Sequence, residues 1–380
     1  MFQARRKPSC SLCLGPLRLF GFWYFVLGIF PPATIWLALA IPALAQAPAT
    51  WEGKTVRQWA EQLEAADAGA NYYAAYVLGQ LGPQAADAVE PLKKMLQKRS
   101  VAKSVPGYED WEYVRGTAAW ALGRIGPAAD SAVPLLMETM HSKGHVSVRR
   151  NSNEALGNLA AAAKPAVPDL LAALADEDAI TRVNAAVALW KIQRHPKALP
   201  ALVEMLRQEK GPAAYHAAVA LGTLELSAPG TPEPPAADPA RICAEALVKA
   251  LGAADPDVAR AAARSLGQIG RSVPRVALPA IQPALEGPRD EVRRMAAEAL
   301  GWMGPAAVEP LRAVLKNDSP AARRAAARAL GRLGPAARTA EADLVEAVND
   351  PDAEVRTAAA KALRLLRGES PTAAGQPPAE

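Results

Sequence analysis

Histidine and cysteine are the side chains that most often carry metal or nucleophilic chemistry, and this chain holds four histidines and three cysteines. His141 and His145 stand four residues apart in a polar turn, close enough for both imidazoles to bind one metal ion. No further ligand follows at a suitable spacing, and the CxxC pair Cys10 and Cys13 has no second pair to complete a zinc site. The sequence therefore predicts no metal centre and no cofactor.

The remaining chemistry-bearing residues form no catalytic pattern either. His195 precedes a proline, and His216 lies in an alanine-rich helical segment. The sequence has no phosphate-binding loop, no dinucleotide glycine motif and no Gly-x-Ser-x-Gly elbow. We therefore expect no catalytic residues, so the function must come from the surface that the fold presents.

The first 45 residues indicate export. They contain four basic residues and no acidic one, and an apolar stretch from Leu19 to Ala45 ends in small residues. This pattern predicts a signal peptide that is cleaved before Gln46 or Pro48. Because the apolar stretch is long enough to cross a bilayer, an uncleaved anchor in the cytoplasmic membrane is the alternative. In both cases the rest of the chain lies outside the cytoplasm, in the periplasm or beyond the cell.

The charge balance argues against a nucleic-acid partner. The formal net charge is +5, but the export segment supplies most of that excess. From residue 46 onward, 39 basic residues stand against 38 acidic ones. Domains that bind nucleic acid instead carry a clear excess of Lys and Arg on one face.

A leucine, followed in most cases by glycine, recurs nine times inside alanine-rich segments. Most steps between these leucines are 30 to 34 residues, and two steps are 44 and 45 residues. A period of this size is typical of stacked two-helix units, because one unit cannot bury its apolar face alone. We call these residues the anchor leucines: Leu78, Leu122, Leu156, Leu189, Leu221, Leu266, Leu300, Leu330 and Leu363.

The residues around each anchor leucine predict a helix with one apolar face. Alanines three and four residues before the leucine share that face with an apolar residue three after it. The following glycine removes a side chain where the next helix packs. Gly-Pro pairs such as Gly82-Pro83 predict a left-handed glycine that ends one helix and a proline that begins the next. Acidic turns such as Asp350-Pro351-Asp352 predict the N-terminal cap of the second helix.

The pattern Asp-Pro-x-x-Val-Arg-x-x-Ala-Ala-x-Ala-Leu-Gly-x-Ile-Gly-Pro resembles the HEAT repeat, in particular the phycobilisome-lyase HEAT-like type. Its best matches are residues 350–366, 318–335 and 114–127, and the resemblance covers about residues 55–367. It implies an all-α fold, an α-solenoid or superhelix of about nine stacked two-helix repeats.

Other segments flank or interrupt the repeats. We expect a linker at residues 46–54, loop insertions at 99–110 and 226–239, and a disordered tail at 368–380. Trp51 and Trp59 precede the first regular repeat, so we expect them to cover its end, because terminal repeats need caps.

The arginine of the pattern stands seven residues before the anchor leucine. The resemblance implies a ladder of acidic turns and arginines along the repeats. Asn71, Ala214 and Ala259 replace the arginine in three repeats, so the ladder should be interrupted there. The repeat arginines are Arg115, Arg149, Arg182, Arg293, Arg323 and Arg356.

Positions six before, two before and two after each anchor leucine point away from the buried face, at ~100° per residue. We call these 27 positions the outward stripe; ten are Arg or Lys, two are Glu and five are aromatic. Residues 257–338 also hold 14 basic and seven acidic side chains. The candidate binding residues are Tyr72, Tyr76, Trp120, Arg124, Arg150, Tyr215, Arg260, Arg264, Arg294, Trp302, Arg324, Arg328 and Arg332.

Tyr, Trp and Arg are the residues that anchor protein interfaces. We therefore expect an exported, non-catalytic scaffold that binds a protein or peptide, with a preference for an acidic one. In HEAT-like solenoids the second helix lines the concave side, which implies a groove that is aromatic in its N-terminal half and arginine-rich in its C-terminal half. A solvated face whose arginines pair with nearby acids is the competing interpretation.

Two alternatives for the function stay open. The family resemblance implies a bilin lyase-like enzyme or a chromophore chaperone, although export argues against a cytoplasmic pigment system. If residues 1–45 are not cleaved, they would make the chain a membrane-anchored organiser of an envelope complex, and they are its only expected contact with a membrane.

We predict that the exported protein begins at Gln46 or Pro48. N-terminal sequencing of material from the periplasm or the medium checks this. Recovery of the intact N-terminal segment from the membrane fraction would instead assign it as an anchor.

Overall fold

The computed structural model describes residues 50–65, 67–98, 108–143, 145–208, 210–224 and 239–368. The expected export segment, most of the two expected insertions and nearly all of the expected tail lie outside these residues. The described residues belong to one compact unit, Ala49–Glu380.

The described chain begins with a small antiparallel hairpin, although we assigned residues 46–54 to a linker. Strands β1 (Thr50–Trp51) and β2 (Lys54–Thr55) pair with Thr50 opposite Thr55. Glu52 and Gly53 both have positive φ, which matches the twist of a two-residue hairpin turn. The turn therefore closes strands that are too short for their pattern to be recognised in the sequence.

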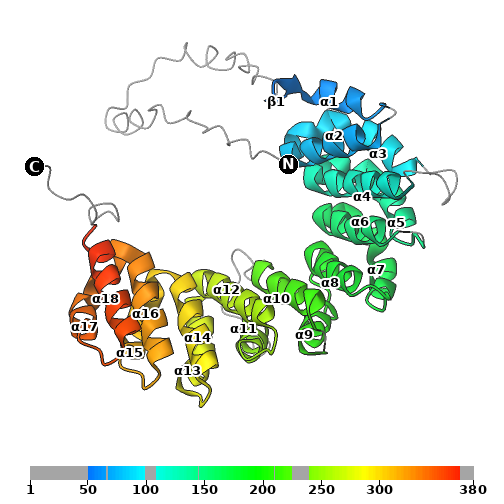
Figure 1. Ribbon diagram of the computed structural model, residues 1–380. Helices are drawn as coiled ribbons and strands as arrows, with labels where there is room; N and C mark the ends of the chain where they lie inside the picture. Colours follow the sequence, from blue (N-terminus) through cyan, green and yellow to red (C-terminus); the bar gives the residue numbers. More distant parts are fainter. Residues whose placement is uncertain are drawn as a thin grey trace, which may run out of the picture. The chain divides into compact units, whose positions relative to one another are not determined.

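Nine helices, one per repeat, contain the anchor leucines. Each of these second helices packs on the second helix of the next repeat, so that they form one continuous layer (Figure 1). The second helices are α2 (Ala68–Leu81), α4 (Tyr108–Ile125), α6 (Val146–Asn158), α8 (Ala179–Gln193), α10 (Pro212–Thr223), α12 (Pro256–Ser272), α14 (Asp290–Met303), α16 (Pro320–Leu333) and α18 (Ala353–Leu366). Helix α4 begins inside the segment 99–110 that we expected to be a loop.

The first helices of the repeats form the other layer, and each packs on the second helix of its own repeat. They are α1 (Val56–Gln62), α3 (Val89–Gln97), α5 (Val133–Thr139), α7 (Val167–Ala173), α9 (Ala198–Gln208), α11 (Pro239–Ala250), α13 (Pro274–Glu286), α15 (Val308–Val314) and α17 (Glu341–Ala347). In five repeats a 3₁₀ segment precedes the first α-helix: η1 (Gly82–Ala88), η2 (Gly126–Ala132), η3 (Ala160–Ala166), η4 (Pro305–Ala307) and η5 (Gly334–Ala340). Within the described residues, this two-layer stack of nine helix pairs confirms the predicted α-solenoid.

The core lies between the two layers, where the predicted apolar face is buried. Eight of the nine anchor leucines have no exposed side-chain surface, and the ninth, Leu363, is 8% exposed. The alanine pairs before them, such as Ala118-Ala119 and Ala326-Ala327, are also fully buried. The core therefore continues from repeat to repeat, as a solenoid requires.

Glycine after the anchor leucine lets adjacent second helices approach closely. A Cβ on Gly123 would lie 2.6 Å from Cα of Ala155, and one on Gly157 would lie 2.8 Å from Cα of Ala188. Both glycines face a backbone that cannot move without separating the helices. The alanine opposite is therefore as important as the glycine, because it keeps the facing surface flat.

The turns follow the predicted pattern. Gly82, Gly126, Gly304 and Gly334 all have positive φ and connect a second helix to the next repeat. In the third repeat Ala160 takes this position with a φ of 49°, although the left-handed region disfavours a residue with a Cβ.

The second helices also begin as the acidic turns predict. The side chains that cap α12, α16 and α18 accept hydrogen bonds from backbone N–H groups of the first turn. These caps are Asp255, Ser319 and Asp352.

The N-terminal end of the stack is covered by Trp59. Its side chain is 2% exposed, its Nε1 donates a hydrogen bond to the carbonyl of Trp51, and its ring meets Tyr73 edge-on. Trp51 itself is 37% exposed. Across the residues that the structure describes, no helix is long and apolar enough to cross a bilayer.

We predict that Gly157→Ala destabilises the protein by about 1–3 kcal/mol, because the added methyl group overpacks α6 against α8. Urea denaturation followed by circular dichroism measures the change. The matched control is Gly69→Ala in α2, where the added Cβ meets only the Asp67 carboxylate at 3.4 Å. Alanine there should be neutral or stabilising, by up to about 1 kcal/mol, through helix propensity. Equal effects at the two sites would contradict the close-approach argument.

Candidate functional site

The outward stripe carries most of the exposed aromatic side chains of the described chain. Tyr72, Tyr76 and Tyr215 are between 38% and 45% exposed, and Trp302 is 36% exposed. On a helical solenoid such exposure is unusual for large rings, which favour burial. The predicted stripe therefore does reach the surface at these positions.

The N-terminal part of the stripe contains one stacked aromatic pair. The rings of Tyr76 and Trp120 lie 5.8 Å apart at an interplanar angle of 10°. Trp120 lies over Gly79, where any Cβ would collide with the ring. The glycine after the first anchor leucine thus makes room for an indole from the next repeat. Tyr215 lies on α10, three repeats after Trp120, and its ring meets His216 edge-on.

The C-terminal part of the stripe is organised around Trp302. The guanidinium carbon of Arg264 lies 5.1 Å from the centroid of the Trp302 ring, and that of Arg332 lies 5.6 Å from it. Trp302 lies over Gly267, and its carbonyl accepts a hydrogen bond from Arg271 at 3.0 Å. Three successive second helices, α12, α14 and α16, therefore meet at one indole ring through cation–π contacts.

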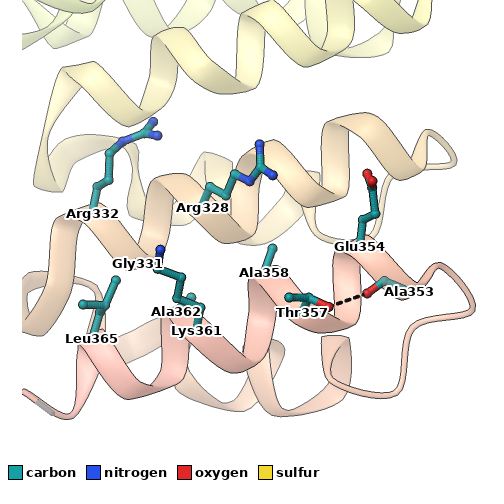
Figure 2. A pocket seen from close by; sticks show the side chains of 10 residues that line it. All are labelled: Arg328, Gly331, Arg332, Ala353, Glu354, Thr357, Ala358, Lys361, Ala362 and Leu365. Atoms are coloured by element: carbon teal, nitrogen blue, oxygen red, sulfur yellow. Dashed lines mark hydrogen bonds between the residues drawn. The ribbon is translucent and has the colours of Figure 1, made fainter. Parts of the chain in front are cut away.

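A pocket of about 710 Å³ opens between α16 and α18 next to this cluster (Figure 2). Arg328 and Arg332 line it from α16, and Lys361 lines it from α18. Burial lowers the pKa of Arg332, and the charge of Arg328 lowers it further, although Glu298 acts in the opposite direction. The pocket is lined by Arg328, Gly331, Arg332, Ala353, Glu354, Thr357, Ala358, Lys361, Ala362 and Leu365.

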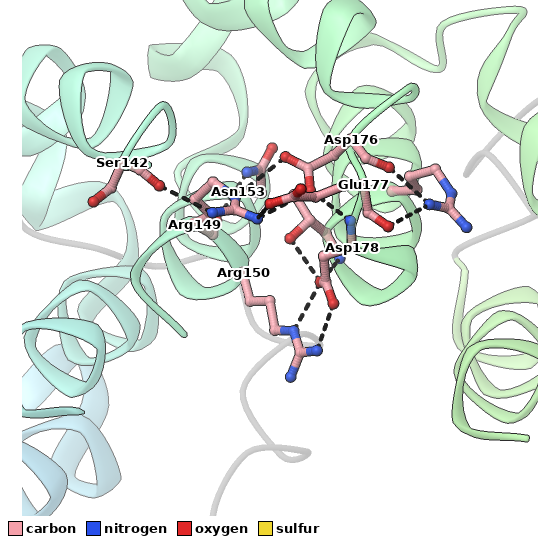
Figure 3. A network of polar contacts seen from close by, with 9 residues as sticks. Ser142, Arg149, Arg150, Asn153, Asp176, Glu177 and Asp178 are labelled. Carbon is pink, nitrogen blue, oxygen red and sulfur yellow. Dashed lines mark hydrogen bonds and ion pairs between the residues drawn. The ribbon is translucent and has the colours of Figure 1, made fainter. Parts of the chain in front are cut away.

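Several stripe arginines pair with carboxylates. Arg150 donates to both oxygens of Asp178 at 2.8 and 2.6 Å (Figure 3). Burial alone would raise the pKa of Asp178, but hydrogen bonds from Arg150 and Thr181 outweigh it and hold that pKa well below its usual value. The other pairs are Arg260 with Asp257, Arg294 with Glu291 and Glu298, and Arg324 with Glu354. For these four arginines the competing interpretation, a face of internal ion pairs, describes the structure.

The centre of the stripe holds a partly buried carboxylate, Glu154. Burial raises its pKa, and the charges of Lys191 and Arg124 oppose that increase. Lys191 also donates a hydrogen bond to Asn158 at 2.8 Å. The candidate residue Arg124 is exposed, and its charge acts on Glu154. Arg124 therefore lies beside a compensating charge rather than in a cationic cluster.

The repeat arginines lie in the second helices, and two of them bind the turns on either side of them. Arg149 donates to the carbonyl of Ser142 at 3.0 Å and forms ion pairs with Asp176 and Glu177 of the next turn (Figure 3). Arg323 bridges in the same way, from the carbonyl of Asn317 to both oxygens of Asp350. These two arginines thus tie their own turns to the turn of the following repeat, as the resemblance implied.

Most of the repeat arginines donate a hydrogen bond to a carbonyl at the same sequence spacing. Arg182, Arg293, Arg323 and Arg356 each donate to the carbonyl six residues earlier. Asn71, which replaces the arginine in the first repeat, also donates to the carbonyl six residues earlier, at 2.9 Å. The amide therefore restores the local bond, although it is too short to reach the next turn. Arg115 follows the long insertion and binds the carbonyl of Leu96 and the carboxylate of Glu112 instead.

Two of the residues that could carry chemistry have ordinary surroundings in the described chain. His141 lies 3.6 Å from a carboxylate oxygen of Asp169, and Cys243 is buried within α11. Within the described ranges, no group of three His, Cys, Asp or Glu side chains could hold a metal ion.

The sequence did not identify the floor of the pocket. Gly331, Ala358 and Ala362 are indistinguishable from other small core residues of the pattern, and only their place beside Arg328 and Arg332 makes them a floor. Lys361 lies on the outward stripe, so that position was a usable signal. No sequence feature marked it as a neighbour of the arginines of α16.

We predict that Arg323→Gln lowers the free energy of unfolding by about 1.5–3 kcal/mol, because it removes charge-assisted hydrogen bonds in the turn. The bond from Arg323 lowers the pKa of Asp350, against the effect of burial. A lowered carboxylate pKa stabilises the fold above its unfolded pKa of ~3.9, and this contribution is lost as the pH falls through the lower folded value.

The variant should therefore lose part of the pH dependence of stability below about pH 4. Urea denaturation at several pH values measures this dependence. The control is Arg338→Gln, an exposed arginine of η5. If the Arg323 variant behaves like this control, the bonds from Arg323 to Asn317 and Asp350 add nothing to the free energy of unfolding.

The comparisons agree with this geometry. Residues 133–222, 244–320 and 308–374 match the family described as HEAT repeats, and residues 70–98 and 114–141 match the PBS lyase HEAT-like repeat. Similar solved structures include an engineered protein at 23% identity and importin beta at 15% identity. The first has a TM-score of 0.37 over 82% of this chain and 88% of that chain, and the second has 0.47 over 85% and 46%. No curated protein matches the sequence. Because the HEAT-repeat matches span more than half of its length, the chain belongs to the HEAT-repeat family.

Proposed function

We propose that this HEAT-repeat scaffold is non-catalytic and binds an acidic segment of a partner protein on the outward stripe of α12 to α18. One observation carries the proposal. Arg264, Arg328, Arg332 and Lys361 converge on this part of the stripe, and none of the four forms an ion pair with a carboxylate within the described part of the chain, although Glu298 attracts Arg332 at longer range. Cations that the fold does not neutralise internally remain available to an external anion.

Ion pairs elsewhere on the stripe limit the surface that is available to a partner. Arg150, Arg260, Arg294 and Arg324 each have a carboxylate neighbour, so an incoming acid would have to displace an existing ion pair. The binding surface is therefore narrower than the full set of stripe arginines. It consists of the Trp302 cluster and the adjoining pocket.

The aromatic part of the stripe offers a second contact region. Tyr72 and Tyr76 are exposed on α2, and Trp120 supports Tyr76 from α4. Rings that are already stacked lose little conformational entropy on binding and bury a large area. A partner long enough to reach both regions would be held by apolar contacts at one end and by charge at the other.

The proposed location is outside the cytoplasm, in the periplasm or beyond the cell. The basic start, the apolar stretch and the small residues before Gln46 support it. An envelope location also supports a peptide or protein as the partner rather than a nucleic acid.

Binding of a labelled acidic peptide, measured by fluorescence anisotropy, tests the function. We predict that replacing Arg264, Arg328 and Arg332 together by Gln weakens binding at least about tenfold, because charge-assisted hydrogen bonds are lost. A peptide with Gln in place of each Glu should bind the unmodified protein equally weakly.

The matched control removes the same charge from the first-helix layer, with Lys94, Lys164 and Arg338 replaced by Gln; all three are exposed. This control should bind as the unmodified protein does, and circular dichroism should show equal helix content in both variants. If the two triple variants bind alike, only net charge matters, and the assignment of the surface is wrong.

A further inference from the structure

The pocket between α16 and α18 combines an apolar floor with a cationic rim. The floor is shallow because the two helices pack closely at Gly331, where a Cβ would lie 3.0 Å from Cα of Ala362 and 3.4 Å from Leu365. Ala358 and Ala362 continue the floor along α18, and the half-exposed Leu365 closes one end. Small side chains on both helices thus leave a recess instead of a filled surface.

Three cations surround this recess, and within the described chain none of them forms an ion pair with a carboxylate; Glu298 attracts Arg332 only at longer range. Arg328 and Arg332 project from the same side of α16, one turn apart, and Lys361 stands on α18 (Figure 2). The one carboxylate in the lining, Glu354, forms an ion pair with Arg324, one turn before Arg328. The charge of Glu354 is therefore already used.

Arg332 connects the pocket to Trp302. Its guanidinium lies over the Trp302 ring, and its Nη2 lies where a Cβ of Gly301 would be, so the head group rests on α14. Burial against α14 lowers the pKa of Arg332, Glu298 raises it and the charge of Arg328 lowers it, while the residue as a whole stays exposed. The proximity of Arg328 therefore carries an electrostatic cost. An anion in the pocket would relieve this electrostatic cost without any change of fold.

We propose that this pocket is a carboxylate-recognition subsite that takes one acidic side chain of an extended partner segment, together with an apolar side chain two residues away. The subsite rests on the proposed function. Side chains at positions i and i+2 of an extended chain point to the same side, about 7 Å apart. The acid can then meet Arg328 and Lys361 while the apolar side chain covers Ala358 and Leu365.

A single carboxylate fits the surroundings better than a polyphosphate. Glu298 acts electrostatically on Arg332, and Glu354 lines the pocket, so a strand with a charge at every unit would meet repulsion within a few residues. An apolar floor also adds nothing to the binding of a phosphate. The rim supplies the charge and the floor supplies the selectivity.

The test uses a fluorescein-labelled peptide with the motif Glu-x-Leu and two matched peptides, Gln-x-Leu and Glu-x-Ser. The Glu-x-Leu peptide should bind most tightly. The Gln peptide should lose about tenfold in affinity, and the Ser peptide should lose several-fold. Lys361→Gln should weaken binding of the Glu peptide about tenfold and leave the Gln peptide unchanged, because only the carboxylate senses that charge.

Two further variants separate the pocket from its surroundings. Thr357→Trp places a large ring in the pocket at an exposed position of α18 without changing any charge, and it should abolish the preference for Glu-x-Leu. Arg338→Gln, outside the pocket, should change nothing. Binding should also alter tryptophan fluorescence through Arg332, and Trp302→Phe should remove that signal.

The outcomes distinguish the subsite from the function. If the acidic peptide binds and the Arg264, Arg328 and Arg332 variant weakens it, while Lys361→Gln and Thr357→Trp do not, the pocket assignment is wrong and the proposed function stands. If the peptide does not bind at all, both fail. Displacement of the peptide by inorganic phosphate or by a single-stranded oligonucleotide at lower concentration than by a free Glu-x-Leu peptide would overturn the carboxylate assignment.

Discussion

The close approach of adjacent second helices is the constraint on which the rest of this structure depends. Glycine after the anchor leucine and alanine on the facing helix bring two backbones together, as at Gly157 and Ala188. Where the facing residue is large, the same glycine accommodates it, as for Trp120 over Gly79 and Trp302 over Gly267. A packing device of the core thus also fixes the aromatic rings of the outward stripe.

Electrostatics divides the stripe into two kinds of surface. Arg150 is neutralised by the capping carboxylate of the next second helix, so it holds neighbouring repeats together. Arg324 holds the equivalent position on α16 and pairs with Glu354 of α18. Arg328 stands four residues further along α16, where α18 presents small residues and Lys361. The paired arginines all stand six residues before an anchor leucine, whereas the unpaired cations stand two before or two after one. The difference between a structural and an available cation therefore follows its position along the second helix.

Repetition made much of the fold predictable. The predictable features depend on residues within one repeat, where spacing fixes geometry. They are the helix pairs, the buried leucines, the left-handed glycines, the capping acids and the carbonyl bonds of the repeat arginines. The replacement of arginine by Asn71 shows the limit of that reasoning. The sequence predicted an interruption, but the amide still reaches the carbonyl of Ala65, because that bond is local and short. Only the bridge to the next repeat is lost.

The sequence by itself determined which residues are buried and which helix face points outward, because a helical period converts spacing into direction. Tertiary structure alone decided what the outward side chains do. Arg264, Trp302 and Arg332 are 38 and 30 residues apart along the chain, yet they form one cluster. A contact between repeats, such as this cluster, depends on how neighbouring repeats rotate against each other and on the rotamers they allow. Neither is encoded in the spacing of a single repeat.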